Sequence, residues 1–162
     1  MDDWPDITAQ QIALTVSIAV VGAAVGAFFS GQVSDRVGRK PVILFADFLF
    51  TGGALIMGYA PTIGYLILGR FIVGIGVGAA SQIVPLYLSE VAPVEIRGTL
   101  VSFSVMISTF AMFAAGLLAY ALKPDWRWML GLAGIPSSLQ FIGMFFMPES
   151  PRWLGVNDKP LQ

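Results

Sequence analysis

Two long apolar segments separated by a short basic cluster constrain the fold of this chain more than any other feature. Residues 7–34 contain no charged side chain, and residues 41–69 contain only Asp47. Residues 31–40 join the two segments and contain Asp35, Arg36, Arg39 and Lys40. A helix needs about 20 mostly apolar residues to cross the hydrocarbon core of a bilayer. The pattern therefore predicts two membrane-spanning helices joined by a short charged loop.

Composition supports an integral membrane protein. The chain has 162 residues, of which 56% are hydrophobic and 12% are charged, whereas a soluble domain has about 25% charged residues. The net charge of −1 argues against nucleic acid as a partner. The sequence has no Cys and no His, which removes thiol catalysis, Cys/His metal sites and the commonest general base. We therefore expect no enzyme activity, no cofactor and no metal.

The required length of about 20 mostly apolar residues predicts five spans along the chain and an all-α membrane fold. The period-2 alternation of strands is absent, and the third span is expected to continue through Pro85 with a bend there. The five predicted spans are residues 10–30, 41–60, 63–84, 98–122 and 128–147.

Basic residues predict the orientation of these spans, because they concentrate on the cytoplasmic side. Two basic residues, Lys123 and Arg127, fall on one side, together with an acidic N-terminal segment. The opposite side carries six: Arg36, Arg39, Lys40, Arg97, Arg152 and Lys159. The expected topology has the N-terminus outside and the C-terminus in the cytoplasm. Five spans with an outside N-terminus suggest that a helix is missing before Met1.

Aromatic side chains agree with that orientation, since Trp and Tyr gather at both membrane interfaces. Trp153 falls at the predicted inner boundary. The residues at the predicted outer boundary are Tyr59, Tyr65, Tyr120, Trp126 and Trp128.

Arg70 lies inside the third predicted span, near its outer end. A charge there costs at least roughly 2.5–3.5 kcal/mol on insertion scales, so such residues usually face a partner or a water-filled cavity. The alternative is that its side chain extends to the outer surface. No acidic residue of the other spans lies at this depth, because Asp47 is near the cytoplasmic end of its span. We therefore expect the partner of Arg70 to lie outside this chain.

Acidic and basic residues also alternate along the predicted cytoplasmic side. Exposed ion pairs contribute only about 0–1 kcal/mol each, and any one of these segments could be a solvated loop. A network of such pairs could still bias a conformational equilibrium, and we expect one that closes the inner side. Its candidate members are Asp35, Arg36, Arg39, Glu90, Glu95, Arg97, Glu149 and Arg152.

The fourth predicted span carries the hydroxyl side chains of Ser104, Ser108 and Thr109. These hydroxyls could line a substrate path, or they could bond to carbonyl groups of their own helix. The sequence leaves both interpretations open. Residues 74–79 fit a dinucleotide-binding glycine pattern, but that pattern needs a preceding strand, and here it falls inside a span.

Four motifs in this order resemble the sugar porter family of the major facilitator superfamily. Some further positions are most similar to the proton-coupled inositol transporters, including Asp47, Trp126 and Trp128. The resemblance covers residues 10–154. The motifs are Gly31…Asp35-Arg36-Val37-Gly38-Arg39-Lys40, Gly69-Arg70, Pro85-Leu86-Tyr87…Glu90…Pro93…Arg97-Gly98 and Pro148-Glu149-Ser150-Pro151-Arg152-Trp153-Leu154.

The resemblance implies a protein of twelve spans in two halves, of which residues 1–162 correspond to spans two to six. It implies a plasma-membrane transporter that moves a sugar or polyol by alternating access. It also implies that Arg70 faces an acid on the missing first helix and takes part in proton coupling. The expected partners are the lipid bilayer, a sugar or polyol, a proton and the missing helices.

The chain departs from that family in its fourth predicted span. Sugar porters commonly place amide side chains there to bind substrate hydroxyls, but the corresponding positions hold Ser104, Val105 and Met112. A pocket that loses such groups loses affinity for polyols. An alternative function is therefore a truncated chain that does not transport and that associates with a full-length relative.

Overall fold

The computed structural model describes residues 8–121 and 134–156, and every regular element in those ranges is an α-helix. The expected all-α fold is therefore confirmed. Helices suit a bilayer because they satisfy their own backbone hydrogen bonds. Their bounds are α1 Ala9–Val37, α2 Arg39–Gly58, α3 Ile63–Val91, α4 Arg97–Ala121, α6 Gly134–Phe146 and α7 Pro151–Val156.

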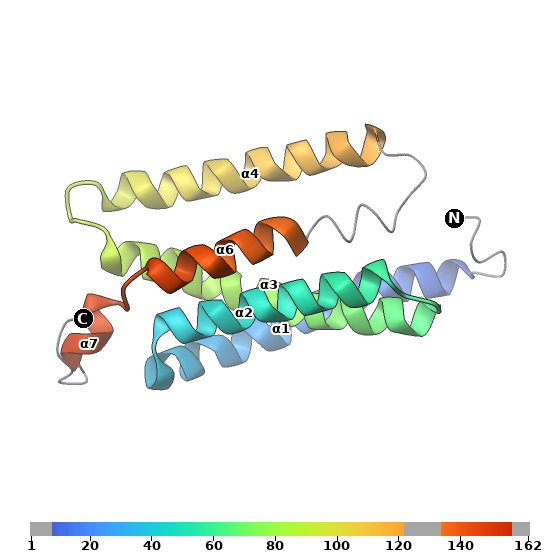
Figure 1. Cartoon of the computed structure of the whole chain (residues 1–162), viewed down its shortest axis with the longest axis horizontal. Helices are drawn as coiled ribbons and strands as arrows, with labels where there is room; N and C mark the ends of the chain where they lie inside the picture. Colours follow the sequence, from blue (N-terminus) through green and yellow to red (C-terminus); the bar gives the residue numbers. More distant parts are fainter. Residues whose placement is uncertain (1–7, 122–133, 157–162) are drawn as a thin grey trace.

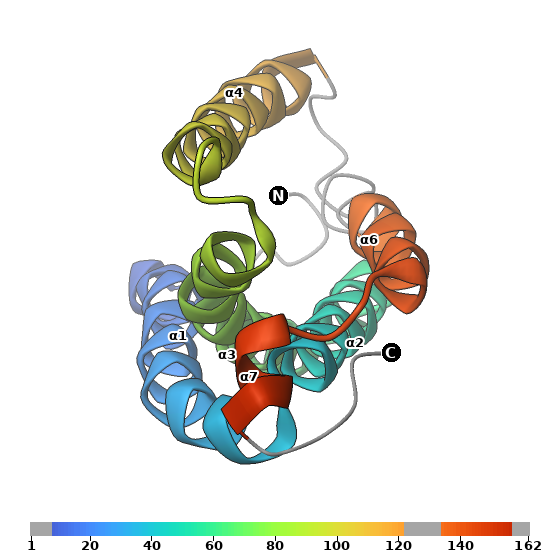
Figure 2. The same cartoon turned by 90° about the vertical axis from the view of Figure 1, so that its left-hand side faces the viewer.

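Helix α3 is the centre of the assembly, because it packs against both α1 and α2. Helix α6 lies on α2, while α4 stands away from the other helices and contacts mainly α3 (Figure 2). The turn between α1 and α2, the end of α3, the start of α4, the end of α6 and the short α7 all lie at one end of the bundle (Figure 1). We call this the Gly38 end.

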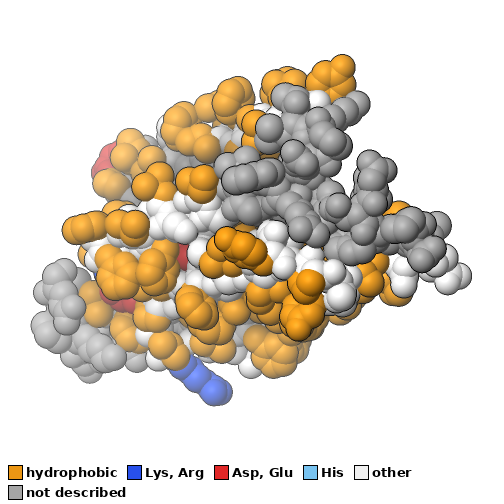
Figure 3. Space-filling view, turned by 45° about the vertical axis from the view of Figure 1, so that its right-hand side comes forward, with side chains coloured by type: hydrophobic (Ala, Val, Ile, Leu, Met, Phe, Trp, Pro, Cys, Tyr) orange, Lys and Arg blue, Asp and Glu red, His pale blue; other side chains and the backbone are white. Residues whose placement is uncertain are grey.

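Within residues 8–121 and 134–156, four helices are long and apolar enough to cross a membrane. By length and composition they are residues 10–37, 39–58, 63–91 and 97–118. The fifth expected span, 128–147, begins outside the described residues, and its described part is α6, an apolar helix of 13 residues. Large hydrophobic side chains cover much of the molecular face in Figure 3, as expected for a surface in contact with lipid.

The charged segment at residues 31–40 is helical except at one position, so the expected loop is shorter than predicted. Helix α1 continues to Val37, α2 begins at Arg39, and only Gly38 lies between them. Its φ of 110° lies in a region that is costly for residues with a Cβ. A Cβ built on Gly38 would lie 2.6 Å from Glu149 Oε2. The absence of a side chain thus permits both the sharp turn and the approach of Glu149.

Helices α1 and α3 touch through their backbones. A Cβ built on Gly26 would lie 2.1 Å from the carbonyl oxygen of Ile75, and one built on Gly78 would lie 1.9 Å from that of Ala23. Small residues permit this approach in membrane proteins, where helix association depends on close packing rather than on the hydrophobic effect. The α1–α3 pair therefore forms a closely packed core for the other helices.

Candidate functional site

The densest group of polar contacts lies at the Gly38 end, where Arg39 is the central residue. Its guanidinium donates to Glu90 twice, with Nε 3.1 Å from Oε2 and Nη2 3.3 Å from Oε1. Nη2 also lies 3.2 Å from Asp35 Oδ1, and Nη1 donates to the carbonyl oxygen of Ser34 at 3.1 Å. The side chains of Arg39 and Glu90 are 11% and 4% exposed, whereas that of Asp35 is 72% exposed. The Arg39–Glu90 pair is thus the shielded part of the network.

Glu149 covers the beginning of α2. Its Oε1 accepts the backbone N–H groups of Arg39 at 3.0 Å and Lys40 at 3.1 Å, and also that of Ser150 at 2.9 Å. The first N–H groups of a helix have no partner within the helix and form its positive end. A carboxylate at this position satisfies them and is favoured by the helix dipole.

Lys40 makes the converse contact with the end of α6. Its Nζ donates to the carbonyl oxygens of Phe145 at 3.0 Å and Met147 at 2.7 Å. A cation is favoured at the negative end of a helix. Glu149 and Lys40 therefore tie α2 and the end of α6 together in both directions. From the sequence, Lys40 was expected only as a basic residue of the cytoplasmic side and of the family motif, and its bonds to the end of α6 were not predicted.

Three further hydrogen bonds complete this group, which we call the Arg39 cluster. Ser150 Oγ donates to Glu90 Oε2 at 2.5 Å, and Trp153 Nε1 donates to the carbonyl oxygen of Asp35 at 3.0 Å. The hydroxyl of the buried Tyr87 donates to the carbonyl oxygen of Pro148 at 2.6 Å. The sequence motifs contained Ser150, Trp153 and Tyr87, but charge alone did not single them out. The Arg39 cluster consists of Asp35, Arg39, Lys40, Tyr87, Glu90, Glu149, Ser150 and Trp153.

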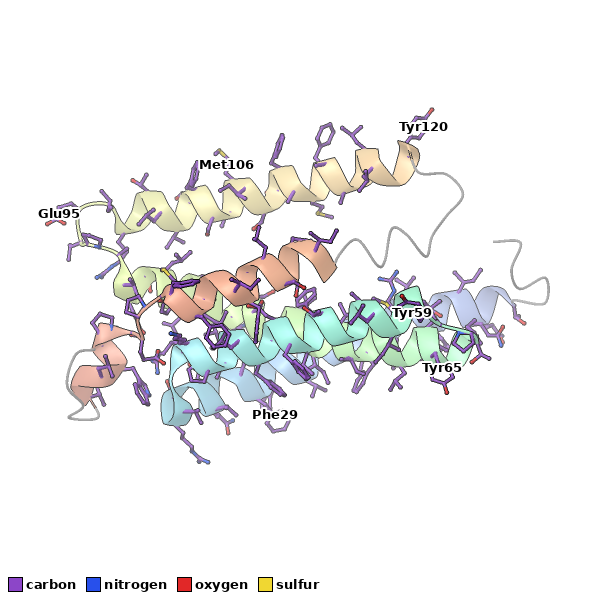
Figure 4. The ribbon with its side chains drawn as sticks, in the orientation of Figure 1. Phe29, Tyr59, Tyr65, Glu95, Met106 and Tyr120 are labelled. Atoms are coloured by element: carbon purple, nitrogen blue, oxygen red, sulfur yellow. The ribbon has the colours of Figure 1, made fainter. Side chains whose placement is uncertain are left out.

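Four of the expected gating residues lie outside the Arg39 cluster. Arg36, Arg97 and Arg152 are exposed, and they form no ion pair with the part of the chain that the structure describes. Glu95 is also exposed, at the tip of the connection between α3 and α4 (Figure 4). The structure thus brings together Asp35, Arg39, Glu90 and Glu149 and leaves the other charges on the surface.

Arg70 lies near the opposite end of α3. Its Nε is buried, and it has no hydrogen-bond partner among residues 8–121 and 134–156. Tyr59, Tyr65 and Tyr120 lie at this same end of the bundle (Figure 4). A buried donor without a partner is costly, so this Nε is a candidate for contact with an acceptor outside the described residues.

The hydroxyls of α4 bond to their own helix. Ser104 Oγ donates to the carbonyl oxygen of Val101 at 2.8 Å, Ser108 Oγ to that of Ser104 at 2.9 Å, and Thr109 Oγ1 to that of Val105 at 3.0 Å. These bonds are the local alternative that the sequence left open. They leave oxygen lone pairs available, and none of these three side chains hydrogen-bonds to another helix in the described part of the chain.

Comparison with known proteins gives a consistent result. The family model described as "Sugar (and other) transporter" matches residues 3–161. The chain is 51% identical to probable inositol transporter 2 of Arabidopsis thaliana over 87% of the chain and 25% of that protein. It is 44% identical to the galactose-proton symporter of Escherichia coli K12 over 93% of the chain and 33% of that protein. It therefore spans between a quarter and a third of the length of these relatives.

A solved structure shows the same fold. The partially occluded inward-open form of the xylose transporter XylE from E. coli superposes with a TM-score of 0.83 and 29% identity. The match covers 96% of this chain and 44% of the XylE chain. The helices at the Gly38 end are thus arranged as in a solved transporter of the major facilitator superfamily.

Proposed function

This chain belongs to the sugar (and other) transporter family, and on that premise we propose that it forms part of a membrane transporter for a sugar or polyol. The observation that carries the proposal is the 51% identity to a probable inositol transporter across 87% of the chain. An inositol-like polyol is accordingly the first substrate to test. The helix arrangement shared with XylE supports alternating access as the mechanism.

Proton coupling is the second part of the proposal, with Arg70 as the residue that takes part in it. The similarity to a galactose-proton symporter supports a proton as the coupling ion. Arg70 supplies a buried Nε without an acceptor in the described part of the chain. A carboxylate from a further helix would complete this site, and protonation of that carboxylate would release Arg70. The binding of a proton could thereby be linked to movement of α3.

The Arg39 cluster would act as an inner brace in this mechanism. Its buried contacts hold together the ends of α1, α2, α3 and α6, so these helices would move as one unit during alternating access. The exposed Arg36, Arg97 and Arg152 would be available on the same side for contacts with the other half of the transporter. We also propose that the Gly38 end faces the cytoplasm and that the protein lies in the plasma membrane.

Val105 and Met112 of α4 are apolar, and they are 59% and 80% exposed, so polar contacts from α4 to a polyol would come from its hydroxyl side chains. Ser104, Ser108 and Thr109 retain lone pairs that can accept hydrogen bonds from polyol hydroxyls. We propose these three residues as the contribution of α4 to the substrate path.

The test is uptake of labelled inositol, xylose and galactose by proteoliposomes, with and without an inward proton gradient. The samples are the complete protein in which residues 1–162 occur, the 162-residue chain alone, and the chain co-purified with an inositol transporter relative. Uptake by the complete protein that rises with the gradient supports the proposal. Absence of uptake for all three substrates contradicts it. If only the co-purified complex shows altered uptake, the chain acts instead by association with a relative.

A further inference from the structure

Asp47 is an acidic residue enclosed within the membrane-spanning part of α2. It is 3% exposed, and its Oδ2 is buried without a hydrogen-bond partner in the described part of the chain. Acidic side chains inside spans are costly, and they usually face a partner or mark a functional site. Asp47 belongs neither to the Arg39 cluster nor to the Arg70 site, so its presence needs a separate explanation.

The helices that pack on α2 offer no cation to Asp47. Helix α6 contains no ionisable residue, and neither do residues 71–86 of α3. The two basic residues at the start of α2 bond to groups other than Asp47. Arg39 pairs with Glu90 and Asp35, and Lys40 bonds to the end of α6.

The remaining titratable groups on the elements that pack against α2 are Tyr65, Arg70 and Tyr87 on α3, Glu149 between α6 and α7, and Arg36 at the end of α1. None of these forms an ion pair with Asp47 within the described residues. An ionised Asp47 would therefore be an uncompensated charge in an apolar environment.

Hydroxyl groups beside Asp47 join α2 to α6. Ser137 Oγ donates to the backbone carbonyl oxygen of Asp47 at 3.0 Å, and it lies 2.8 Å from Thr51 Oγ1. Ser137 has one O–H group, so Thr51 is the donor in the second bond. Thr51 lies one helical turn after Asp47, and its Oγ1 still has lone pairs that can accept a hydrogen bond. If Asp47 is a neutral carboxylic acid, its O–H group can donate a hydrogen bond to Thr51 Oγ1 or to a backbone carbonyl of the preceding turn.

We propose that Asp47 is a proton-binding site inside the bilayer, and that its protonated form holds α6 against α2. Binding forms the carboxylic O–H bond, and release breaks that bond and returns the proton to bulk water. The carboxylate left behind would need water around it, which requires the α2–α6 contact to open. The site is separate from Arg70, and the inference does not depend on the proposed transport function.

Infrared difference spectroscopy tests the protonation directly. The purified protein in lipid nanodiscs is compared with its Asp47→Asn variant, in which an amide replaces the acid at similar size. We expect the wild type alone to show the carbonyl stretch of a protonated carboxylic acid at neutral pH, and we expect this band to disappear at alkaline pH. Glu95→Gln is the matched control, because Glu95 is exposed and its replacement should leave the band unchanged.

The α2–α6 contact is measured separately by disulfide formation. A Cβ on Gly134 would lie 3.6 Å from the Cβ of Ala54, which is within the range for a disulfide. The chain has no native cysteine, so an Ala54→Cys, Gly134→Cys variant reports this contact alone. We expect cross-linking by a mild oxidant to fall at the pH that removes the acid band. We expect no such fall when Asp47→Asn is added.

Two results would overturn the inference. One is a difference spectrum at neutral pH that contains a carboxylate band for Asp47 and no acid band. The other is a cross-linking yield whose pH dependence is the same in the double-cysteine variant with Asp47 as in the one that also carries Asp47→Asn. If Asp47→Asn fails to fold, Asp47→Glu replaces it, and a shifted acid band then assigns the signal, whereas an unshifted band contradicts the assignment.

Discussion

Arg39 and Glu90 form a shielded, two-bond pair between the first turn of α2 and the last turn of α3. The two residues are 51 positions apart in the sequence, yet both charged groups are almost covered by the surrounding helix ends. Additional hydrogen bonds from Ser150 and to Ser34 satisfy the remaining polar atoms. Of the two ion pairs that Arg39 forms with described residues, the pair with Glu90 is the more shielded from solvent.

Replacement of Glu90 by Gln should destabilise the protein by about 3–5 kcal/mol, because it leaves the shielded guanidinium of Arg39 with only the exposed Asp35 as a charge partner. Thermal unfolding in detergent measures the change. Arg152→Ala is the control, because Arg152 is exposed and its loss should change stability by less than about 0.5 kcal/mol. Equal effects of the two substitutions would contradict the assignment of the pair.

Gly38→Ala should destabilise the turn between α1 and α2 by about 1–2 kcal/mol, since a residue with a Cβ is strained at a φ of 110°. The contact with Glu149 Oε2 adds to this cost. In a Glu149→Ala background only the backbone cost remains, so the effect of Gly38→Ala should be smaller there. Gly31→Ala is the control, because a Cβ at Gly31 has nothing within 4 Å. A double-mutant cycle of unfolding temperatures checks this coupling.

Gly26→Ala should weaken the contact between α1 and α3 by about 1–3 kcal/mol, because the new methyl group meets the Ile75 backbone. The same substitution at Gly52 of α2 adds a methyl group with nothing within 4 Å and should be neutral. Expression level and unfolding temperature of the two variants provide the comparison. A loss of stability at Gly52 as large as at Gly26 would show that helix packing is not the cause.

Arg70→Gln should abolish accumulation driven by a proton gradient while it spares exchange of labelled for unlabelled substrate. The reason is that exchange needs no net proton movement, whereas the proposed coupling would need the charge of Arg70. Both rates are measured in the same proteoliposomes. Loss of both rates to the same extent would assign Arg70 to the structure of the transporter rather than to coupling.

Opening of the Gly38 end can be followed at Ser34, whose side chain is fully buried. A Ser34→Cys variant places a single thiol there, because the native chain has no cysteine. Labelling by a membrane-impermeant reagent should be slow, and it should accelerate when Glu90→Gln is added. Arg97→Ala should accelerate it only if Arg97 contacts the other half of the transporter. Unchanged labelling with Glu90→Gln would contradict the role of the Arg39 cluster as a brace.

The sequence predicted the helices well because long stretches without charge have few alternatives in a bilayer. It misjudged the segment at residues 31–40, since Asp35 and Arg36 indicated a loop, while the structure continues α1 past both. Charged residues are compatible with a helix once it leaves the apolar core. Only the conformation of Gly38 then separates α1 from α2.

The sequence also predicted which charges gather on one side, but it did not predict which of them pair. Arg36 and Arg39 have the same chemistry, yet only Arg39 faces Glu90. That choice depends on the direction of each side chain around the turn at Gly38. The capping role of Lys40 was missed for a similar reason, because its acceptors are backbone carbonyls and these have no signature in the sequence.

The contact between Glu149 and the start of α2 joins residues 110 positions apart, and this separation has a consequence for biogenesis. A ribosome completes α2 long before it adds Glu149, so the first N–H groups of α2 remain without this acceptor while α3, α4 and α6 are made. The same delay applies to Lys40, whose acceptors lie at the end of α6. The contacts that close this end can therefore form only after the last of these helices has been synthesised.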